Sequence, residues 1–245
     1  MEDRCPTGIP GLDEILGGGF PRSRSILLAG TCGTGKTTFG IQYLVNGVLQ
    51  YGEPGIMVTL EQDSEEIRND MGKYGWDLRK LEDEKKLLLV DTSLSKIGIK
   101  DYVTSLPVAS DRSFSILPGE FDFERITEIV TTAAEKIGAK RVVIDSLPAL
   151  DVLSKDEVDI RRVLLQMNYE FKKNGLDSLL ITEINEDDGV SKHGVEEYIA
   201  DGVIILKTNE ALDTRTIKIR KMRVTKHTLK PLALEITPQG IQIKK

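Results

Sequence analysis

Short runs of Ile, Leu and Val recur along most of the chain and are its most regular feature. Several lack the polar–apolar alternation of a half-exposed strand, which is typical of parallel strands covered on both faces. The runs predict strands at 25–30, 55–60, 87–90, 141–145, 178–182 and 202–206. Longer amphipathic segments predict helices at 36–50, 64–75, 122–137 and 156–174. Because strands and helices alternate, we expect an α/β fold with a mainly parallel central sheet, flanked by helices and joined by right-handed crossovers.

The C-terminal part of the chain has a different pattern. Residues 215–221 and 232–244 alternate polar and apolar positions, which predicts antiparallel strands at one edge of the sheet. No composition shift, Pro/Gly-rich linker or internal repeat divides the sequence. We therefore expect a single domain over residues 1–245, with residues 1–22 as an N-terminal lead.

The connection 91–121 is the stretch that the pattern does not assign. It has no sustained period and contains two prolines. A connection of this length is uncommon in a compact domain and is usually functional or mobile. Two interpretations stay open: a surface loop without a role, or a segment that contacts a protein partner.

Composition and charge exclude several classes of protein. The 245 residues carry 33 Lys and Arg against 39 Asp and Glu, so the net charge is −6 and gives no overall field for gripping nucleic acid. No apolar run approaches the ~18 residues of a membrane-spanning helix, and the N-terminus lacks the features of an export signal. Two cysteines cannot build a disulfide framework or a four-ligand zinc site, and two histidines leave little for an all-protein metal cage. We expect a cytoplasmic protein with no membrane partner.

A phosphate-binding loop is the strongest chemical signal. Residues Gly30–Thr37 satisfy G-x-x-x-x-G-K-[ST] and lie between a predicted buried strand and a predicted amphipathic helix. The glycines let backbone N–H groups turn inward around phosphate oxygens, and the helix N-terminus adds partial positive charge. Lys36 is expected to bridge the β- and γ-phosphates, and the Thr37 hydroxyl to hold Mg²⁺. The predicted nucleotide-binding residues are Thr31, Cys32, Gly33, Thr34, Gly35, Lys36, Thr37 and Thr38.

Two other strands end in residues that an enzyme with such a loop can use. Strand 141–145 ends in Asp145, which we expect to contact Mg²⁺, directly or through water. Strand 55–60 is followed by Glu61 and Gln62, at the edge where open α/β sheets bind their ligands. Glu61 could polarise the attacking water while Gln62 helps to position it. Alternatively, Glu61 is part of the acidic cap of the next helix, for which Asp63 and Glu66 are a plausible capping pair.

With these motifs in place, the chain resembles a single KaiC-type domain within the RecA/RadA superfamily of P-loop ATPases. The resemblance extends over most of the sequence. It is carried by TGIPGLD (7–13), GGGFP (17–21), GTCGTGKTT (30–38), GEPG (52–55), VTLEQ (58–62), YGWDL (74–78), VVIDS (142–146), Arg161-Arg162, ITEI (181–184), GVEEY (194–198), and Lys221-Met222-Arg223 with Thr225 and His227.

The resemblance implies a RecA-like core that hydrolyses ATP to ADP with Mg²⁺. It also implies a homo-oligomer, often a hexameric ring, with nucleotide between neighbouring subunits. Lys36, Glu61 and Gln62 are the implied catalytic residues. Glu61 resembles the first of two adjacent catalytic carboxylates, whereas Gln62 departs from the second, usually Glu, which puts the rate in question. Cys32 replaces the more usual Ser. The clock protein of the family has two such domains, so neither a clock function nor autophosphorylation follows for this chain.

Residues 214–230 contain seven Lys or Arg and no Asp or Glu. Since residues i and i+2 of a strand share a face, Lys221 and Arg223 should point the same way. By the resemblance, both reach the γ-phosphate held by the neighbouring subunit, as arginine fingers do, with Thr225 and His227 near the same nucleotide. Two alternatives stay open: a stripe that binds nucleic acid, and an edge strand whose lysines block aggregation.

Three functions are compatible with these residues. The leading hypothesis is a KaiC-like oligomeric ATPase in a regulatory or signalling role. The alternative is a RadA/RadB-like recombinase paralogue that binds single-stranded DNA in an ATP-dependent way. Against it, the acidic run 186–188 lies where recombinases place a DNA-contacting segment, and His193 in that loop is expected to be structural or solvated. The third is a nucleotide-gated scaffold that presents 91–121 to a protein partner.

Overall fold

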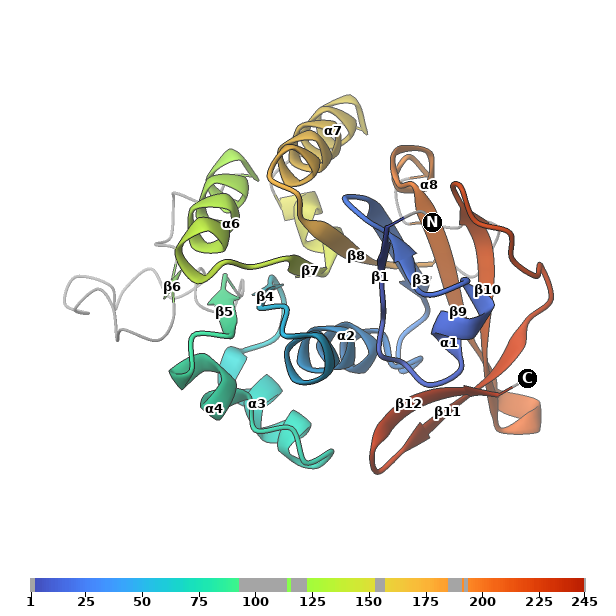
Figure 1. The fold of residues 1–245 in the computed structure, drawn as a ribbon. Coiled ribbons are helices and arrows are strands. Elements are labelled where there is room, and N and C mark those ends of the chain that lie inside the picture. The colour runs from blue at the N-terminus through green and yellow to red at the C-terminus, as the bar shows by residue number, and fades with distance from the viewer. Residues whose placement is uncertain are drawn as a thin grey trace.

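A ten-stranded sheet forms the centre of the computed structural model, which describes residues 3–92, 114–115, 123–152, 157–184, 191 and 194–244 (Figure 1). Along the sheet the strands are β12 (Gly240–Lys244), β11 (Leu232–Thr237), β10 (Thr214–Met222), β9 (Gly202–Asn209), β3 (Ser25–Gly30), β8 (Asp177–Glu183), β7 (Arg141–Asp145), β4 (Gly55–Thr59), β5 (Leu87–Asp91) and β6 (Phe114–Ser115). Strands β9 to β6 pair in parallel, whereas β9 to β12 pair antiparallel. The predicted parallel sheet with an antiparallel C-terminal edge is confirmed.

Helices cover both faces of the sheet (Figure 1). One face carries α2 (Lys36–Tyr51), α3 (Ser64–Gly72) and α4 (Leu78–Asp83), and the other carries α6 (Phe123–Ile137) and α7 (Glu157–Lys173). Each face has its own apolar core: Ile26 and Leu28 of β3 pack in one, and Leu27 in the other. Successive side chains of β3 are therefore all buried, which explains the unbroken apolar run. No helix in the described part of the chain is both long and apolar enough to span a bilayer.

The predicted bounds agree closely with the structure for the long elements. Strands β3 and β7 match, β4 and β5 differ by one residue at one end, β8 is longer by one residue at each end, and β9 continues to Asn209. Helix α3 ends three residues early, at Gly72. Its cap is Asp63, which accepts the Glu65 N–H at 2.7 Å. Of the unassigned connection, residues 93–113 and 116–122 lie outside the described residues, as do 186–188 and His193.

The short elements escape prediction because they span too few residues for a hydrophobic period to register. Besides α4 and β6, they are β1 (Arg4–Cys5), α1 (Leu12–Ile15), β2 (Phe20–Pro21), α8 (Glu196–Ile199), and the 3₁₀ turns Leu147–Val152 and Glu210–Leu212. The first three of these belong to the N-terminal lead, where β1 and β2 form a separate two-stranded sheet.

The C-terminal hairpin β11–β12 folds back beside α2. The buried Gln42 side chain of α2 donates to the Ile241 carbonyl at 2.8 Å and accepts the Ile241 N–H at 2.6 Å. Its amide therefore pairs with β12 as a neighbouring strand would. A Cβ on Gly35, the residue before α2, would lie 3.0 Å from Ile236 Cδ1. The hairpin thus packs against the point where the phosphate-binding loop becomes a helix.

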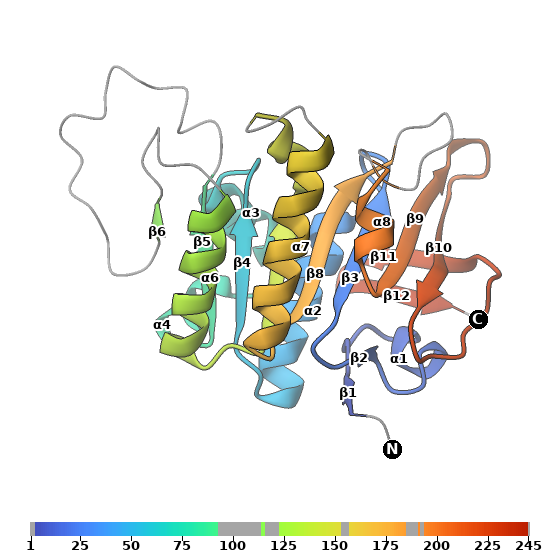
Figure 2. The ribbon, with the colours of Figure 1, turned by 90° about the horizontal axis from the view of Figure 1, so that it is seen from above.

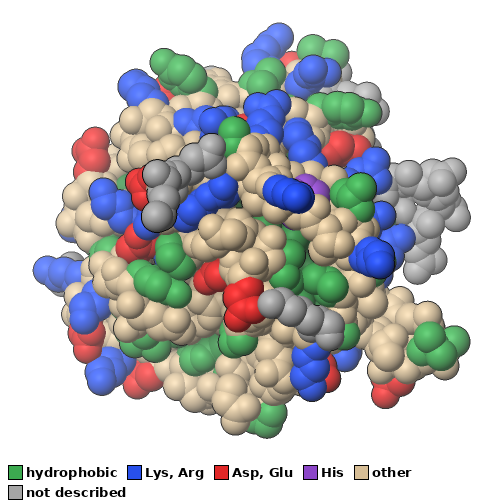
Figure 3. All heavy atoms as spheres, turned by 45° about the vertical axis from the view of Figure 1, so that its right-hand side comes forward, with side chains coloured by type: hydrophobic (Ala, Val, Ile, Leu, Met, Phe, Trp, Pro, Cys, Tyr) green, Lys and Arg blue, Asp and Glu red, His purple; other side chains and the backbone are tan. Residues whose placement is uncertain are grey.

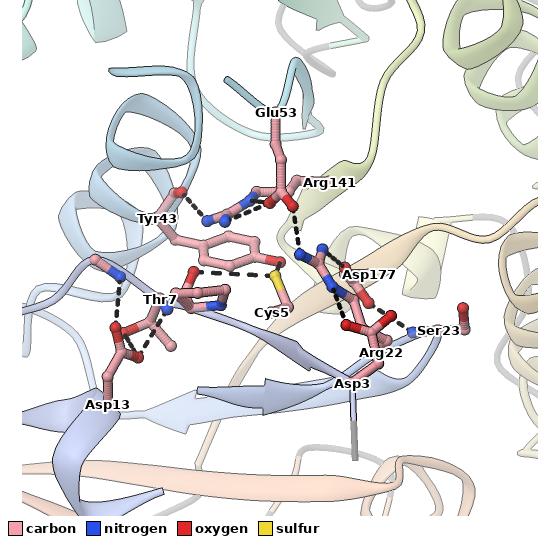
Figure 4. Close-up of polar contacts among 12 residues, drawn as sticks. Asp3, Cys5, Thr7, Asp13, Arg22, Ser23, Tyr43, Glu53, Arg141 and Asp177 are labelled. Carbon is pink, nitrogen blue, oxygen red and sulfur yellow. Dashed lines mark hydrogen bonds and ion pairs between the residues drawn. The ribbon is translucent and has the colours of Figure 1, made fainter. Parts of the chain in front are cut away.

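A buried ion-pair network lies at the amino-terminal ends of the parallel strands (Figure 4). Arg141, at the start of β7, donates from Nε to Glu53 Oε2 at 2.8 Å and from Nη1 to the Tyr43 carbonyl at 2.9 Å. Arg22 bridges Glu53 and Asp177, whose Oδ2 lies 2.7 Å from Nη1. Figure 2 shows the N-terminal lead at this same end of the strands. The network joins the lead to the sheet, and each buried charge has an opposite partner.

Gly47→Ala should destabilise the protein, although Ala favours a helix over Gly by about 1 kcal/mol. A Cβ at position 47 would lie 2.6 Å from Arg141 Nε, so the guanidinium must shift and its pair with Glu53 weakens. We expect the free energy of unfolding, measured by urea denaturation, to fall by about 2–4 kcal/mol. Gly72→Ala, a helical position with nothing within 4 Å of the added Cβ, is the matched control and should be neutral or slightly stabilising. Equal stability of the two variants would contradict this prediction.

Candidate active site

The predicted phosphate-binding loop joins β3 to α2 and has the conformation that its glycines allow. Gly33 and Gly35 have φ angles of 74° and 93°, in the left-handed region that other residues rarely adopt. The buried Thr34 hydroxyl donates to the Thr31 carbonyl at 2.9 Å and holds the curve of the loop. Cys32 and Gly33 at its tip are exposed, and Thr38 lies in the first turn of α2.

The ammonium of Lys36 lies against this loop. Its Nζ donates to the carbonyls of Gly30 at 2.9 Å and Thr31 at 2.8 Å. These are hydrogen bonds to neutral acceptors, which a phosphate oxygen can replace with a stronger, charge-assisted bond. The geometry therefore suits a lysine that exchanges carbonyls for phosphate.

Thr37 and Asp145 meet at the predicted metal position. The Thr37 hydroxyl donates to Asp145 Oδ2 at 2.6 Å. Burial is the main cause that raises the pKa of Asp145 to about 6; the nearby Glu61 carboxylate acts in the same direction, whereas the Thr37 bond and Lys36 oppose the shift. A buried carboxylate with a raised pKa gains from a cation. A hydroxyl and a carboxylate are oxygen ligands of the kind that Mg²⁺ prefers.

Glu61 and Gln62 lie in the loop that follows β4, beside Asp145. Glu61 Oε1 accepts the Ser146 hydroxyl at 2.6 Å, and the Gln62 carbonyl accepts the Thr59 hydroxyl at 2.6 Å. The cap of α3 is provided by Asp63, and the described contact of Glu61 is with the residue after Asp145. Of the two interpretations of Glu61, the geometry favours a place in the site over a role in the helix cap.

The four predicted trans-acting residues do not join this site. Lys221, at the end of β10, pairs with Val203, which in turn is level with Leu27 near the start of β3. The phosphate-binding loop begins at Gly30, at the other end of the same strand. Arg223 follows beyond the end of β10, still farther toward the amino-terminal edge. Within one chain, the basic residues and the phosphate-binding loop therefore lie at opposite ends of the strands.

Lys221 and Arg223 both contact the segment that precedes β9, although Arg223 lies outside the strand on which a shared face was predicted. The register shifts between Ile219 and Lys221, and β10 ends at Met222. Lys221 Nζ donates to the Ala200 carbonyl at 2.6 Å, and Arg223 Nη1 lies 3.0 Å from Asp201 Oδ1. The prediction that residues two apart share a strand face is therefore wrong beyond Met222, because the strand ends and the chain turns there.

The residues after Arg223 form a loop held by the N-terminal lead. Arg4 donates from Nη1 to the Thr225 hydroxyl at 2.5 Å and from Nη2 to the Val224 carbonyl at 2.9 Å. His227 Nδ1 lies 3.1 Å from the Thr228 carbonyl. Thr225 and His227 thus belong to the same loop as Arg223, and Arg4 connects that loop to β1.

A sequence model of the family described as "ATPase: KaiC" matches residues 5–245. The chain belongs to the KaiC family. It is 37% identical over 244 residues to a UPF0273 protein of Aeropyrum pernix, covering 98% of this chain and 93% of that protein. It is 34% identical over 242 residues to the circadian clock protein KaiC2 of Synechocystis sp., of whose length it spans 40%. The crystal structure of a KaiC-like protein from Pyrococcus horikoshii gives a TM-score of 0.83 at 36% identity, with both chains fully covered.

Membership of the KaiC family confirms the predicted resemblance and the RecA-like fold. It makes the chain a KaiC-like ATPase domain, and the family implies nucleotide binding. The roles of single residues in this KaiC-family chain remain predictions.

Sequence reasoning missed three residues that support the predicted site residues. Ser146 had a signal, since its hydroxyl directly follows Asp145 in the motif VVIDS. Arg4 and Asp201 had none, because their partners lie more than twenty residues away in the sequence.

Cys32 should react with thiol reagents, and bound ATP should protect it, because it lies exposed at the tip of the phosphate-binding loop. Cys5 is fully buried, and burial raises the pKa of its thiol to about 12, so it serves as the unreactive internal control. We expect one rapidly modified thiol per chain by mass spectrometry, and slower modification with ATP and Mg²⁺. Cys32→Ser should abolish rapid labelling. Labelling that ATP does not slow would count against this loop as the nucleotide site.

Asp145→Asn should stabilise the nucleotide-free, metal-free protein at neutral pH. The raised pKa of Asp145 means that the folded state holds its proton up to about pH 6, whereas the unfolded chain releases it near the ordinary value of 3.8. Ionised Asp145 therefore costs the wild type about 3 kcal/mol of stability above pH 6, and nothing below pH 4. Urea denaturation in EDTA should show the variant more stable at pH 7.5 and equal to wild type near pH 4. A pH-independent difference would overturn this account of Asp145.

Proposed function

We propose that this KaiC-family chain is an Mg²⁺-dependent ATPase that works as a homo-oligomer, a hexameric ring, with each nucleotide between two subunits. The observation that carries the proposal is the separation of the phosphate-binding loop from Arg223. They lie at opposite ends of β3, a strand of six residues in which five steps of ~3.3 Å span ~17 Å. An arginine side chain does not bridge that distance. If Arg223 meets a γ-phosphate, the phosphate is held by another subunit.

Within one subunit, the residues around the phosphate-binding loop have separate roles in the reaction. Lys36 neutralises charge on the β- and γ-phosphates, and the backbone N–H groups of the loop bind their oxygens. Glu61, held by the Ser146 hydroxyl, accepts a hydrogen bond from the attacking water and takes its proton as the oxygen bonds to the γ-phosphorus. The bond to the ADP oxygen breaks in the same displacement. Gln62, an amide, can orient the water and cannot take its proton.

Thr37 and Asp145 would hold Mg²⁺, which would neutralise charge on the phosphate oxygens. Among the described residues there is no group of three or more His, Cys, Asp or Glu that could hold a metal alone. The Thr37–Asp145 pair therefore fits a cation that takes its other ligands from phosphates and water, as Mg²⁺ does in nucleotide sites.

The neighbouring subunit completes the site with Arg223 and Lys221, near Thr225 and His227. Arg223 supplies positive charge to the transferring phosphoryl group, a contribution worth about 10³–10⁵ in rate where arginine fingers act. We also propose that residues 1–245 act as one domain in this assembly, since the lead contacts both the sheet and the Arg223 loop. A regulatory or signalling role, in which 91–121 contacts a protein partner, is the cellular use we propose.

The second candidate function is ATP-dependent binding of single-stranded DNA. The observation that favours it is the set of exposed basic side chains at Arg220, Lys226 and Lys230. Lys and Arg side chains are spread over this face of the molecule (Figure 3). Such a surface binds phosphate backbones with strong salt dependence.

Mixed rings should test the composite site. Arg223→Ala and Glu61→Gln should each assemble and bind ATP, yet each should lose about 10²-fold or more in turnover. When the two are mixed before assembly, a quarter of the interfaces pair an intact Glu61 with an intact Arg223. Steady-state ATPase should therefore recover to about a quarter of wild type. Wild-type specific activity should also rise with protein concentration as sizing shows assembly.

Full activity of Arg223→Ala in assembled protein would overturn the trans-acting role, and so would turnover independent of concentration in a monomer. Stimulation of the ATPase by single-stranded DNA, lost at high salt, would favour the second candidate function.

A further inference from the structure

We infer that Asp201 is a positioning residue for Arg223: it holds the guanidinium where a neighbouring subunit's phosphate can meet it. The inference rests on the proposed composite site and adds to it the group that sets the finger's position. Asp201 lies directly before β9 at the amino-terminal edge of the sheet, and its side chain is 1% exposed. Arg223 itself is 52% exposed, so a buried carboxylate orients a half-exposed cation.

Asp201 holds Arg223 through both side chain and backbone. Its Oδ1 accepts from Arg223 Nη1 at 3.0 Å, and its carbonyl accepts the Arg223 N–H at 3.0 Å. An arginine side chain has several rotatable bonds, and fixing it in advance removes an entropic cost from the moment of reaction. Within the described part of the chain, the guanidinium is held through Nη1 alone, so its other N–H groups can bind a phosphate.

The position of Asp201 is itself fixed by three further groups. Arg24 Nη1 lies 3.2 Å from Oδ1, Lys172 Nζ lies 2.7 Å from Oδ2, and the Ser25 N–H donates to Oδ2 at 3.3 Å. These partners come from the start of β3 and the end of α7. When Arg223 turns toward a phosphate, Asp201 still has two cations and does not become an unpaired buried charge.

The cluster has more positive than negative charge. Asp201 faces three cations, Arg24, Lys172 and Arg223, and a fourth, Lys221, acts on it electrostatically; Glu197, which acts on Lys221, adds one further carboxylate to the cluster. A carboxylate present only to neutralise Arg223 would not need Arg24 and Lys172 as well. The surplus suits an anion that arrives from outside, which in the proposed ring is the γ-phosphate of the neighbouring subunit.

Mixing of variant subunits shows on which side of the composite site the defect of Asp201→Asn lies. The variant keeps the shape of the side chain but loses the charge that orients Arg223. We expect turnover in assembled protein to fall about 100-fold, with an unchanged KM for ATP. When this variant is mixed with Glu61→Gln, whose subunits supply an intact Arg223, activity should recover to about a quarter of wild type. Mixed with Arg223→Ala, it should not recover.

Asp177→Asn is the matched control. Asp177 is an equally buried carboxylate at the start of β8, paired with Arg22, and it does not contact the Arg223 loop. Its variant should keep near wild-type turnover below its melting temperature. If Asp201→Asn does not fold, Asp201→Glu is tested instead. It keeps the charge but moves it by one methylene, and the same pattern of recovery on mixing is expected.

Three outcomes would overturn the inference: full activity of the Asp201 variant, no recovery with either partner, or recovery with Arg223→Ala alone. No recovery would indicate a general folding defect, and recovery with Arg223→Ala alone would place the defect at the subunit's own nucleotide. Full activity of Arg223→Ala would instead refute the proposed function, irrespective of Asp201.

Discussion

Strand β3 is buried on both faces and paired along both edges, and both charged regions of the molecule depend on it. Its carboxyl end becomes the phosphate-binding loop, and the residues at its amino end, Arg24 and Ser25, contact Asp201. A strand held on all sides cannot bend or slide without breaking hydrogen bonds to β8 or β9. In the proposed ring, this rigid strand connects the nucleotide of one subunit with the finger that serves the next.

Two charged clusters, at the carboxyl and amino ends of the parallel strands, carry opposite imbalances of charge. At the carboxyl edge, Asp145 lies near Glu61 and Glu183, with Lys36 as the opposing cation, so burial and like charge raise its pKa. At the amino edge, burial also disfavours ionisation of Asp201, but Lys172 and Arg24 keep its pKa below the usual range. The cluster around Asp145 therefore gains from a cation, and the cluster around Asp201 gains from an anion. Subunits packed head to tail, as proposed here, would bring these edges together with Mg²⁺ and phosphate between them.

The sequence was sufficient for the parts of the fold that have a local cause. The parallel strands were predictable because burial on both faces leaves an unbroken apolar run, as in β3 and β7. The phosphate-binding loop was predictable because its glycines, Lys36 and Thr37 are consecutive. The bonds between Gln42 and Ile241, and the cluster of Arg24, Lys172 and Arg223 on Asp201, were not. Each joins residues that are far apart in sequence, and a single polar residue gives no sign of which distant partner will bury it.

Gln62 gives the loop after β4 a neutral side chain next to Glu61. An acidic residue at this position would place a second carboxylate in the Glu61 loop, whose backbone already lies beside Asp145: the Leu60 N–H donates to the Asp145 carbonyl at 2.7 Å. Like charges at close range favour the protonated forms, so a second carboxylate would raise the pKa of Asp145 further. An amide keeps the hydrogen-bonding capacity without that repulsion. With Gln62, no second carboxylate in the Glu61 loop opposes ionisation of Asp145, and in the proposed function Glu61 is the residue that accepts the proton of the water.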